Sequence, residues 1–144
     1  MPQAQVIFEE LTVLENMSLH GNRASTKEYC KPFPKIFSRF GQLAGTMSGG
    51  EKKILSFIRT MAENGKLIIL DEPSEGVQQE NIEKMAACII RKSSQGCGVI
   101  LIEQNLNFVQ SVATHYLGIE SGEAKLRGCA TQISGVEIAD FLAL

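Results

Sequence analysis

The fold is most clearly indicated by one run of the sequence, Leu67-Ile68-Ile69-Leu70-Asp71-Glu72, in which four aliphatic residues are followed directly by two carboxylates. Such a run is typical of a strand of parallel sheet that is buried on both faces. A buried strand delivers Asp71 to the carboxyl edge of its sheet, where it can hold Mg²⁺ near phosphates. Glu72 can orient and deprotonate a water there. The alternative is two solvated acids at a strand end, and this stretch alone leaves both open.

A second stretch, Met47-Ser48-Gly49-Gly50-Glu51, precedes that strand and opens an amphipathic helix. Two glycines at a helix start leave the backbone N–H groups uncovered, and the helix dipole attracts phosphate oxygens there. Ser48 and Glu51 also form an S-x-x-E capping box, which would serve any helix. Apolar residues then follow at steps of three and four, the spacing of one buried face; they are Ile54, Leu55, Ile58, Met61 and Ala62.

The rest of the chain alternates between helical and strand patterns. We expect a short helix from a Thr12–Glu15 capping box to about His20, and short helices joined by loops over 21–46, the clearest being 35–40. We also expect a helix over 79–92 with Ile90 facing inward, a second buried strand over 98–102, a helix over 105–113, a hairpin over 116–127 and a closing helix over 134–144. The alternation predicts an α/β layer fold in two parts, residues 1–47 and 48–144.

Composition limits the function classes. With 144 residues, 44% apolar, the chain is long enough for one core, and its formal charge of −2 gives no general attraction to nucleic acid or to an anionic bilayer. Its four cysteines show no C-x-x-C pair, which favours free thiols over a zinc site. No apolar run approaches membrane-spanning length. We therefore expect membrane association only through a partner.

The two stretches together resemble the ABC ATPases. Met47 to Glu51 is similar to the signature motif LSGGQ, Leu67 to Glu72 resembles the Walker B strand with its catalytic glutamate, and Pro73 to Val77 matches the D-loop. Pro2-Gln3 stands where the family has its Q-loop glutamine. The resemblance implies a partial P-loop NTPase domain of the ABC type: a Q-loop segment and helical subdomain over 1–47, then the signature helix, Walker B strand and parallel-sheet part over 48–144.

Within the family the chain most resembles ATPase subunits of importers for branched-chain amino acids and, similarly, urea. The residues that carry this likeness are Leu11-Thr12-Val13, Glu15-Asn16, Phe33-Pro34, Ala44-Gly45-Thr46, Asp71 to Gly76 and Glu103-Gln104-Asn105. Most of the family has histidine where this chain has Gln104, and one importer branch resembles this chain in using glutamine. Gln104 can donate a hydrogen bond to a γ-phosphate, but an amide does not transfer protons as an imidazole does.

The resemblance implies ATP and Mg²⁺ as ligands of two domains that sandwich the nucleotide. Asp71 would hold Mg²⁺, Gln3 would sense the metal, Glu72 would act as base, and Gln104 would face the γ-phosphate. The signature positions that would bind the nucleotide of the opposite subunit are Ser48, Gly49, Gly50 and Glu51. The implied partners are a second ABC ATPase subunit and membrane permease subunits, which would place the chain at the cytoplasmic face of the cell membrane.

One motif of the family is absent from the sequence: no G-x-x-x-x-G-K-[ST] occurs, and Glu51 stands in the lysine place after Gly45 and Gly50. Without that P-loop the β- and γ-phosphates have no cradle in the same chain. We therefore expect a truncated ATPase subunit of an ABC importer that is inactive by itself. The alternatives are a fragment that self-associates without hydrolysing ATP, and a soluble ABC ATPase that acts outside transport.

Overall fold

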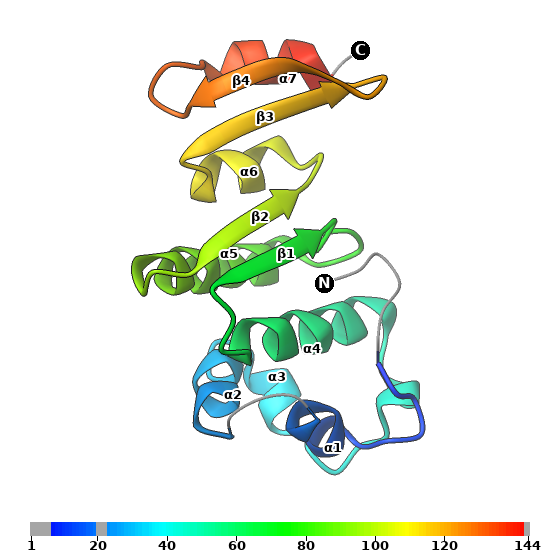
Figure 1. Cartoon of the computed structure of the whole chain (residues 1–144). Helices are drawn as coiled ribbons and strands as arrows, with labels where there is room; N and C mark the ends of the chain where they lie inside the picture. Colours follow the sequence, from blue (N-terminus) through cyan, green and yellow to red (C-terminus); the bar gives the residue numbers. More distant parts are fainter. Residues whose placement is uncertain (1–6, 20–22, 143–144) are drawn as a thin grey trace. The chain divides into compact units, whose positions relative to one another are not determined.

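The computed structural model describes residues 7–19 and 23–142 and divides the chain into two compact units, Met1–Glu103 and Gln104–Leu144. The first unit holds five α-helices, a 3₁₀ turn and two strands in its described part (Figure 1). These are α1 (Val13–Ser18), α2 (Arg23–Cys30), α3 (Pro34–Phe37), η1 (Ala44–Thr46), α4 (Gly49–Ala62), β1 (Leu67–Asp71), α5 (Gln79–Ser94) and β2 (Gly98–Ile102). The second holds α6 (Leu106–Val112), β3 (His115–Glu120), β4 (Glu123–Cys129) and α7 (Gly135–Leu142).

The helical part before α4 forms as predicted, with one correction. The capping box of α1 is present, since Thr12 accepts from the Glu15 N–H and Glu15 accepts from the Thr12 N–H. The helix predicted over 35–40 is shorter and ends at Phe37. The residues that follow Phe37 form hydrogen bonds with the start of α1 instead. The Phe40 carbonyl accepts from the Leu14 N–H at 3.1 Å, and the Gln42 carbonyl accepts from the Val13 N–H at 2.9 Å.

Helix α4 is the centre of the core of the first unit. All five residues predicted for its inner face are buried, and Phe57 packs edge-on against Phe33 with ring centroids 6.4 Å apart. Its carboxyl end is closed by α5, because Lys92 donates from Nζ to the carbonyls of Met61 (2.9 Å) and Glu63 (2.7 Å). Ile90 was predicted to face inward with the rest of α5, but it is exposed.

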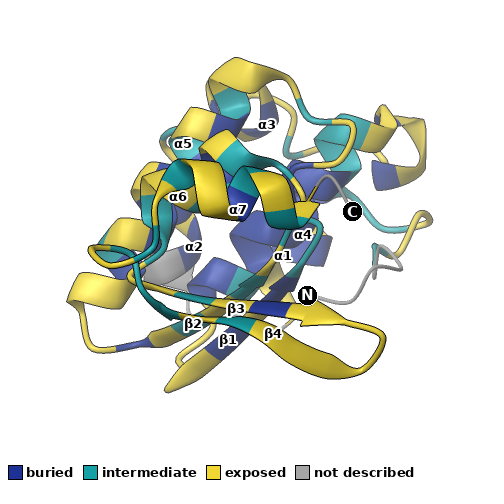
Figure 2. Ribbon diagram, turned by 90° about the horizontal axis from the view of Figure 1, so that it is seen from above, coloured by how far each residue is buried: buried dark blue, intermediate teal, exposed yellow. Residues whose placement is uncertain are grey.

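Strands β1 and β2 pair in parallel, as predicted, with Ile69 opposite Ile100. The prediction that both faces are buried is wrong. Ile68 and Leu70 point into the core, whereas Leu67 and Ile69 on the other face are 56% and 47% exposed, and Ile100 and Ile102 beside them are exposed too (Figure 2). In the described part of the first unit, these aliphatic residues remain open to solvent.

The second unit contains the predicted hairpin. Strands β3 and β4 pair antiparallel around a turn at Ser121-Gly122, where both residues have positive φ. Asn105 caps α6 by accepting from the Phe108 N–H at 3.2 Å. Helix α7 begins with a further capping pair, in which Ser134 and Glu137 accept from each other's backbone N–H groups.

None of the four cysteines forms a disulfide. Burial raises the pKa of Cys30 and of Cys88 to about 11, so both thiols stay protonated at neutral pH. None of the helices in the described part of the chain is long and apolar enough to cross a membrane.

Candidate functional site

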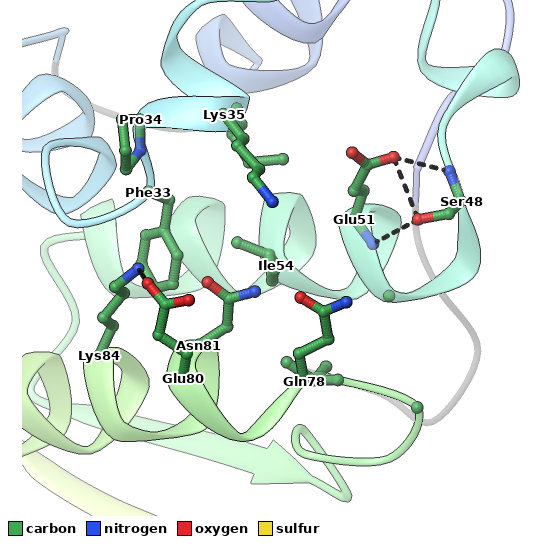
Figure 3. Close-up of a pocket in the computed structure, with 14 residues that line it drawn as sticks. Phe33, Pro34, Lys35, Ser48, Glu51, Ile54, Gln78, Glu80, Asn81 and Lys84 are labelled. Carbon is green, nitrogen blue, oxygen red and sulfur yellow. Dashed lines mark hydrogen bonds and ion pairs between the residues drawn. The ribbon is translucent and has the colours of Figure 1, made fainter.

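The start of α4 has the geometry that its sequence predicts. Ser48 is the N-cap: its hydroxyl accepts from the Glu51 N–H at 3.3 Å, and the Glu51 carboxylate accepts from the Ser48 N–H at 3.0 Å. These bonds are drawn in Figure 3. The hydrogen bond from the Ser48 backbone, with further contributions from the Ser48 hydroxyl and from Arg39, lowers the pKa of Glu51. The predicted capping box is therefore present, and its hydrogen bonds orient the Ser48 hydroxyl at the start of the helix.

The two carboxylates at the end of β1 are held by the sheet and by an unusual backbone turn. Asp71 is the last residue of the strand, and Glu72 follows with φ at +43°, a left-handed conformation that is uncommon for glutamate. The Glu72 N–H donates to the Ile102 carbonyl of β2 at 2.9 Å. Both side chains are half-buried. Hydrogen bonding to β2 thus stabilises a turn that sends the chain sharply away from the sheet edge.

The turn after Glu72 packs against the start of α4. A Cβ added to Gly50 would lie 2.7 Å from the Gly76 carbonyl oxygen, a distance that real Cβ atoms do not show. Gly76 itself has φ at +69°, a conformation that suits glycine. The structure therefore brings the start of α4 into backbone contact with the turn that follows Glu72. Space requires glycine at position 50, and the backbone angle favours glycine at position 76.

Two side chains that we did not predict from the sequence also hold this turn. Lys53 of α4 donates to the Glu75 carboxylate at 3.0 Å, and Glu103, just after β2, accepts from the Ser74 N–H at 2.8 Å. Lys53 directly precedes the inward-facing Ile54, which places it at the edge of the buried face. This position beside the buried face is the feature of the sequence that could have indicated a role for Lys53. A lysine at such a position is ordinarily expected to extend into solvent.

A pocket of about 340 Å³ opens beside the start of α4. Figure 3 shows Lys35 extending from α3 toward the α4 and α5 side chains that line it. The hydrogen bond and the charge of Lys84, at 2.6 Å, lower the pKa of Glu80, and the charge of Lys35 adds to the lowering of the pKa of Glu80 and of Glu51. The pocket shares Ser48, Gly50 and Gly76 with the site, so it is an extension of the site rather than a separate one.

Several predicted residues stand apart from this geometry. Gln3 lies outside the residues that the structure describes, and Gln104 is the first residue of the second unit. No group of three or more His, Cys, Asp or Glu that could hold a metal occurs within residues 7–19 and 23–142. A single carboxylate at a sheet edge, such as Asp71, nevertheless suits Mg²⁺, which commonly uses one or two carboxylates together with phosphate oxygens and water.

The arrangement of helices around a parallel sheet matches solved ATP-binding subunits. A structure described as "Structure of ATP binding subunit of ABC transporter" superposes with a TM-score of 0.82 over 99% of this chain and 67% of that one, at 19% identity. At that identity the match defines the fold, which is that of an ABC-type ATP-binding subunit.

Sequence comparison gives the family. The "ABC transporter" family model matches residues 1–75, and the chain belongs to this family. It is 33% identical over 129 residues to the "High-affinity branched-chain amino acid transport ATP-binding protein BraG" of Pseudomonas aeruginosa, covering 85% of this chain and 55% of BraG. It is 26% identical to the "Lipopolysaccharide export system ATP-binding protein LptB" of Haemophilus influenzae, covering 95% of this chain and 61% of LptB. The chain thus spans little more than half of these relatives.

Proposed function

We propose that this chain carries the signature, Walker B and D-loop part of an ATP-hydrolysing subunit of an ABC transporter. The single observation that carries the proposal is the backbone contact of Gly50 with Gly76, which joins the start of α4 to the turn that follows Glu72. In this proposal Ser48, Gly49 and Gly50, together with Glu51, bind the nucleotide of an opposing subunit through N–H groups and a hydroxyl at a helix start.

The carboxylates at the end of β1 supply the chemistry of hydrolysis. Asp71 binds Mg²⁺, which neutralises charge on the transferred phosphoryl group when it is bound. Glu72 orients the attacking water and accepts its proton. Gln104 donates to the γ-phosphate, and Gln3 completes the metal environment. This division of roles requires a P-loop, for which the sequence of this chain has no match.

We further propose an importer of the branched-chain amino acid type, with a second ATPase subunit and membrane permease subunits as partners. The identity to BraG and the Glu103-Gln104-Asn105 sequence support this branch. The match to LptB extends over more of this chain at lower identity. The similarity therefore supports an ABC transporter more strongly than it supports any one transported substrate.

A second candidate function is an assembly module that does not hydrolyse ATP. The observation that favours it is the exposed aliphatic face of β1 and β2, which invites association.

A fusion protein tests the proposed function. A P-loop segment from an ABC ATPase is joined ahead of Met1, and Mg²⁺-dependent phosphate release is measured. We expect turnover, and we expect Asp71→Asn to remove most of it, because the amide binds Mg²⁺ poorly. Asp140→Asn, in α7, is the matched control and should leave the rate unchanged. A folded fusion without turnover, or one that Asp71→Asn leaves fully active, would contradict the proposal.

A further inference from the structure

The turn from Asp71 to Gly76 is held from two directions by elements that are distant in sequence. On one side, Glu72 donates its N–H to the last residue of β2, and Ser74 donates its N–H to Glu103 Oε1, just beyond β2, at 2.8 Å. On the other side, Lys53 of α4 donates to Glu75 Oε2 at 3.0 Å. Both the sheet and the signature helix are therefore tied to the residues that flank Glu72.

The Lys53 tie is strong because of where its charge lies. The Lys53 side chain is only 5% exposed, whereas the Glu75 side chain is 68% exposed. A buried ammonium that loses its partner carries a large desolvation cost, while an exposed carboxylate that loses its partner is hydrated by water. The ion pair therefore holds the Glu75 carboxylate close to Lys53. Because Glu75 belongs to the turn and Lys53 to α4, the turn is held against α4.

The Glu103 tie acts on the backbone of the same turn. Its carboxylate accepts from the Ser74 N–H, and the Ser74 carbonyl in turn accepts from the Val77 N–H at 3.0 Å. Ser74 is itself buried. A charged acceptor makes a stronger bond than a neutral one, so Glu103 anchors the middle of the turn to the end of β2.

The conformation that these ties preserve is costly. A glutamate with φ at +43° stores backbone strain, and such conformations persist only when surrounding contacts determine them. Gly50 against Gly76 supplies shape, but a glycine contact gives no directional bond. Directional restraint comes from the Glu72 N–H bond to the Ile102 carbonyl and, through the rest of the turn, from Lys53 and Glu103.

We propose that Lys53 and Glu103 are positioning residues that clamp the turn Asp71–Gly76 between α4 and β2 and thereby fix the carboxylate of Glu72 at the sheet edge. The catalytic consequence rests on the proposed ATP hydrolysis, whereas the clamp itself is a property of this chain. Lys53 thus links the signature helix mechanically to the residue that activates water.

Amide hydrogen exchange in the 144-residue chain tests the clamp without any activity. We expect Glu103→Ala to speed exchange at Ser74 by about tenfold or more, and Glu103→Gln, which keeps an acceptor oxygen, to speed it far less. Lys53→Met should speed exchange at Val77, with Lys53→Arg close to the parent. Lys52→Met is the matched control, because Lys52 directly precedes Lys53 in α4 but pairs with Glu9 at 2.6 Å, away from the turn.

Steady-state kinetics in the P-loop fusion tests the consequence. Lys53→Met and Glu103→Ala should each lower kcat about tenfold or more while changing the KM for ATP less than about threefold, since they displace Glu72 and leave the nucleotide contacts. Lys53→Arg and Glu103→Gln should recover most of kcat. Equal loss in Lys52→Met, or an unchanged kcat in folded Lys53→Met, would overturn the proposal.

The two measurements separate this inference from the proposed function. If the parent fusion has no turnover but the exchange pattern appears, the proposed function fails and the clamp stands. If exchange at Ser74 and Val77 is the same in all variants, the clamp is refuted whatever the fusion does.

Discussion

Glu72 occupies a backbone conformation that glutamate seldom adopts, at the point where the chain leaves β1. Strain of this kind is concentrated at functional sites, where surrounding contacts maintain it. Here the contacts come from the Ile102 carbonyl, from Lys53 through Glu75 and from Glu103 through Ser74. The side chain is therefore presented at the sheet edge by its neighbours and not by its own preference.

Replacement of this carboxylate should separate binding from turnover. In the P-loop fusion we expect Glu72→Gln to lower kcat by about 10²–10⁴, because an amide accepts no proton from water. The affinity for ATP should stay within a few-fold, since the substitution keeps size and removes only one charge. Single-turnover phosphate release and nucleotide titration measure the two quantities. More than half of the parent rate in Glu72→Gln would show that another group is the base.

Among the elements, three helices of the described part of the chain, α1, α4 and α7, begin with a glutamate that accepts from the backbone N–H of the capping residue. The hydrogen bond from the Thr12 side chain lowers the pKa of Glu15, and the bonds from the Ser48 and Ser134 backbones lower the pKa of Glu51 and Glu137. A folded pKa below the usual 4.5 contributes stability that is present above that value and is lost as the pH falls through the lowered pKa.

We therefore expect the melting temperature to fall as the pH drops from about 5 to about 3. In Glu51→Gln, the amide keeps an oxygen that can accept from the Ser48 N–H but does not titrate. The melting temperature of this variant should therefore fall less over this pH range. Thermal melts at stepped pH measure both. Glu83→Gln on α5 is the control, and an identical slope for Glu51→Gln and this control would contradict the cap as a source of the pH dependence.

The contact between α4 and α5 offers a second prediction at this scale. Lys92 is buried and donates to the carbonyls of Met61, in the last turn of α4, and of Glu63, its C-cap, and its ammonium lies 5.5 Å from the Tyr29 ring centroid. Lys92→Met leaves those acceptors without their donor and should cost about 2–3 kcal/mol of unfolding free energy. Lys84→Met on the same helix removes only an i,i+4 ion pair with the exposed Glu80 and should cost much less. Equal losses in urea unfolding would refute the capping role.

The elements themselves could be predicted because their signals are local. The Thr12 and Ser48 capping boxes and the three-and-four spacing of α4 lie within a few residues, and all three appear in the structure. Lys53 with Glu75 and Glu103 with Ser74 could not be predicted, since each pair joins separate elements. An apolar run such as Leu67–Leu70 shows which faces a strand could bury, but not whether anything covers them.

For the whole chain, the sequence has stretches that resemble the signature motif and the Walker B carboxylates, but no match to the P-loop pattern. Affinity for ATP in this fold class comes largely from the P-loop amides and lysine around the β- and γ-phosphates. We expect the 144-residue chain alone to bind ATP weakly or undetectably and to release no phosphate. Calorimetry with MgATP is the measurement, and micromolar affinity would show that phosphates are held by residues we have not identified.

The exposed sheet face gives the last prediction, which concerns the association of the chain. Leu67, Ile69, Ile100 and Ile102 lie on one aliphatic face of β1 and β2, which ends at Asp71, opposite Ile102. Contiguous apolar patches of a few hundred Å² are near the upper limit for soluble monomers, and at about 25 cal/mol per Å² covering one favours association by several kcal/mol before entropic costs.

In a solution of the purified chain, the available partner for this face is a second copy. We therefore expect light scattering at tens of micromolar to give a mass above the 15.8 kDa of one chain. Ile69→Gln with Ile100→Gln should return the mass toward that of the monomer. Ile90→Gln is the matched control, because Ile90 is similarly exposed but lies on α5, outside the face, and it should leave association unchanged. A strictly monomeric parent, or equal loss of association in the control, would show that the sheet face is not what drives it.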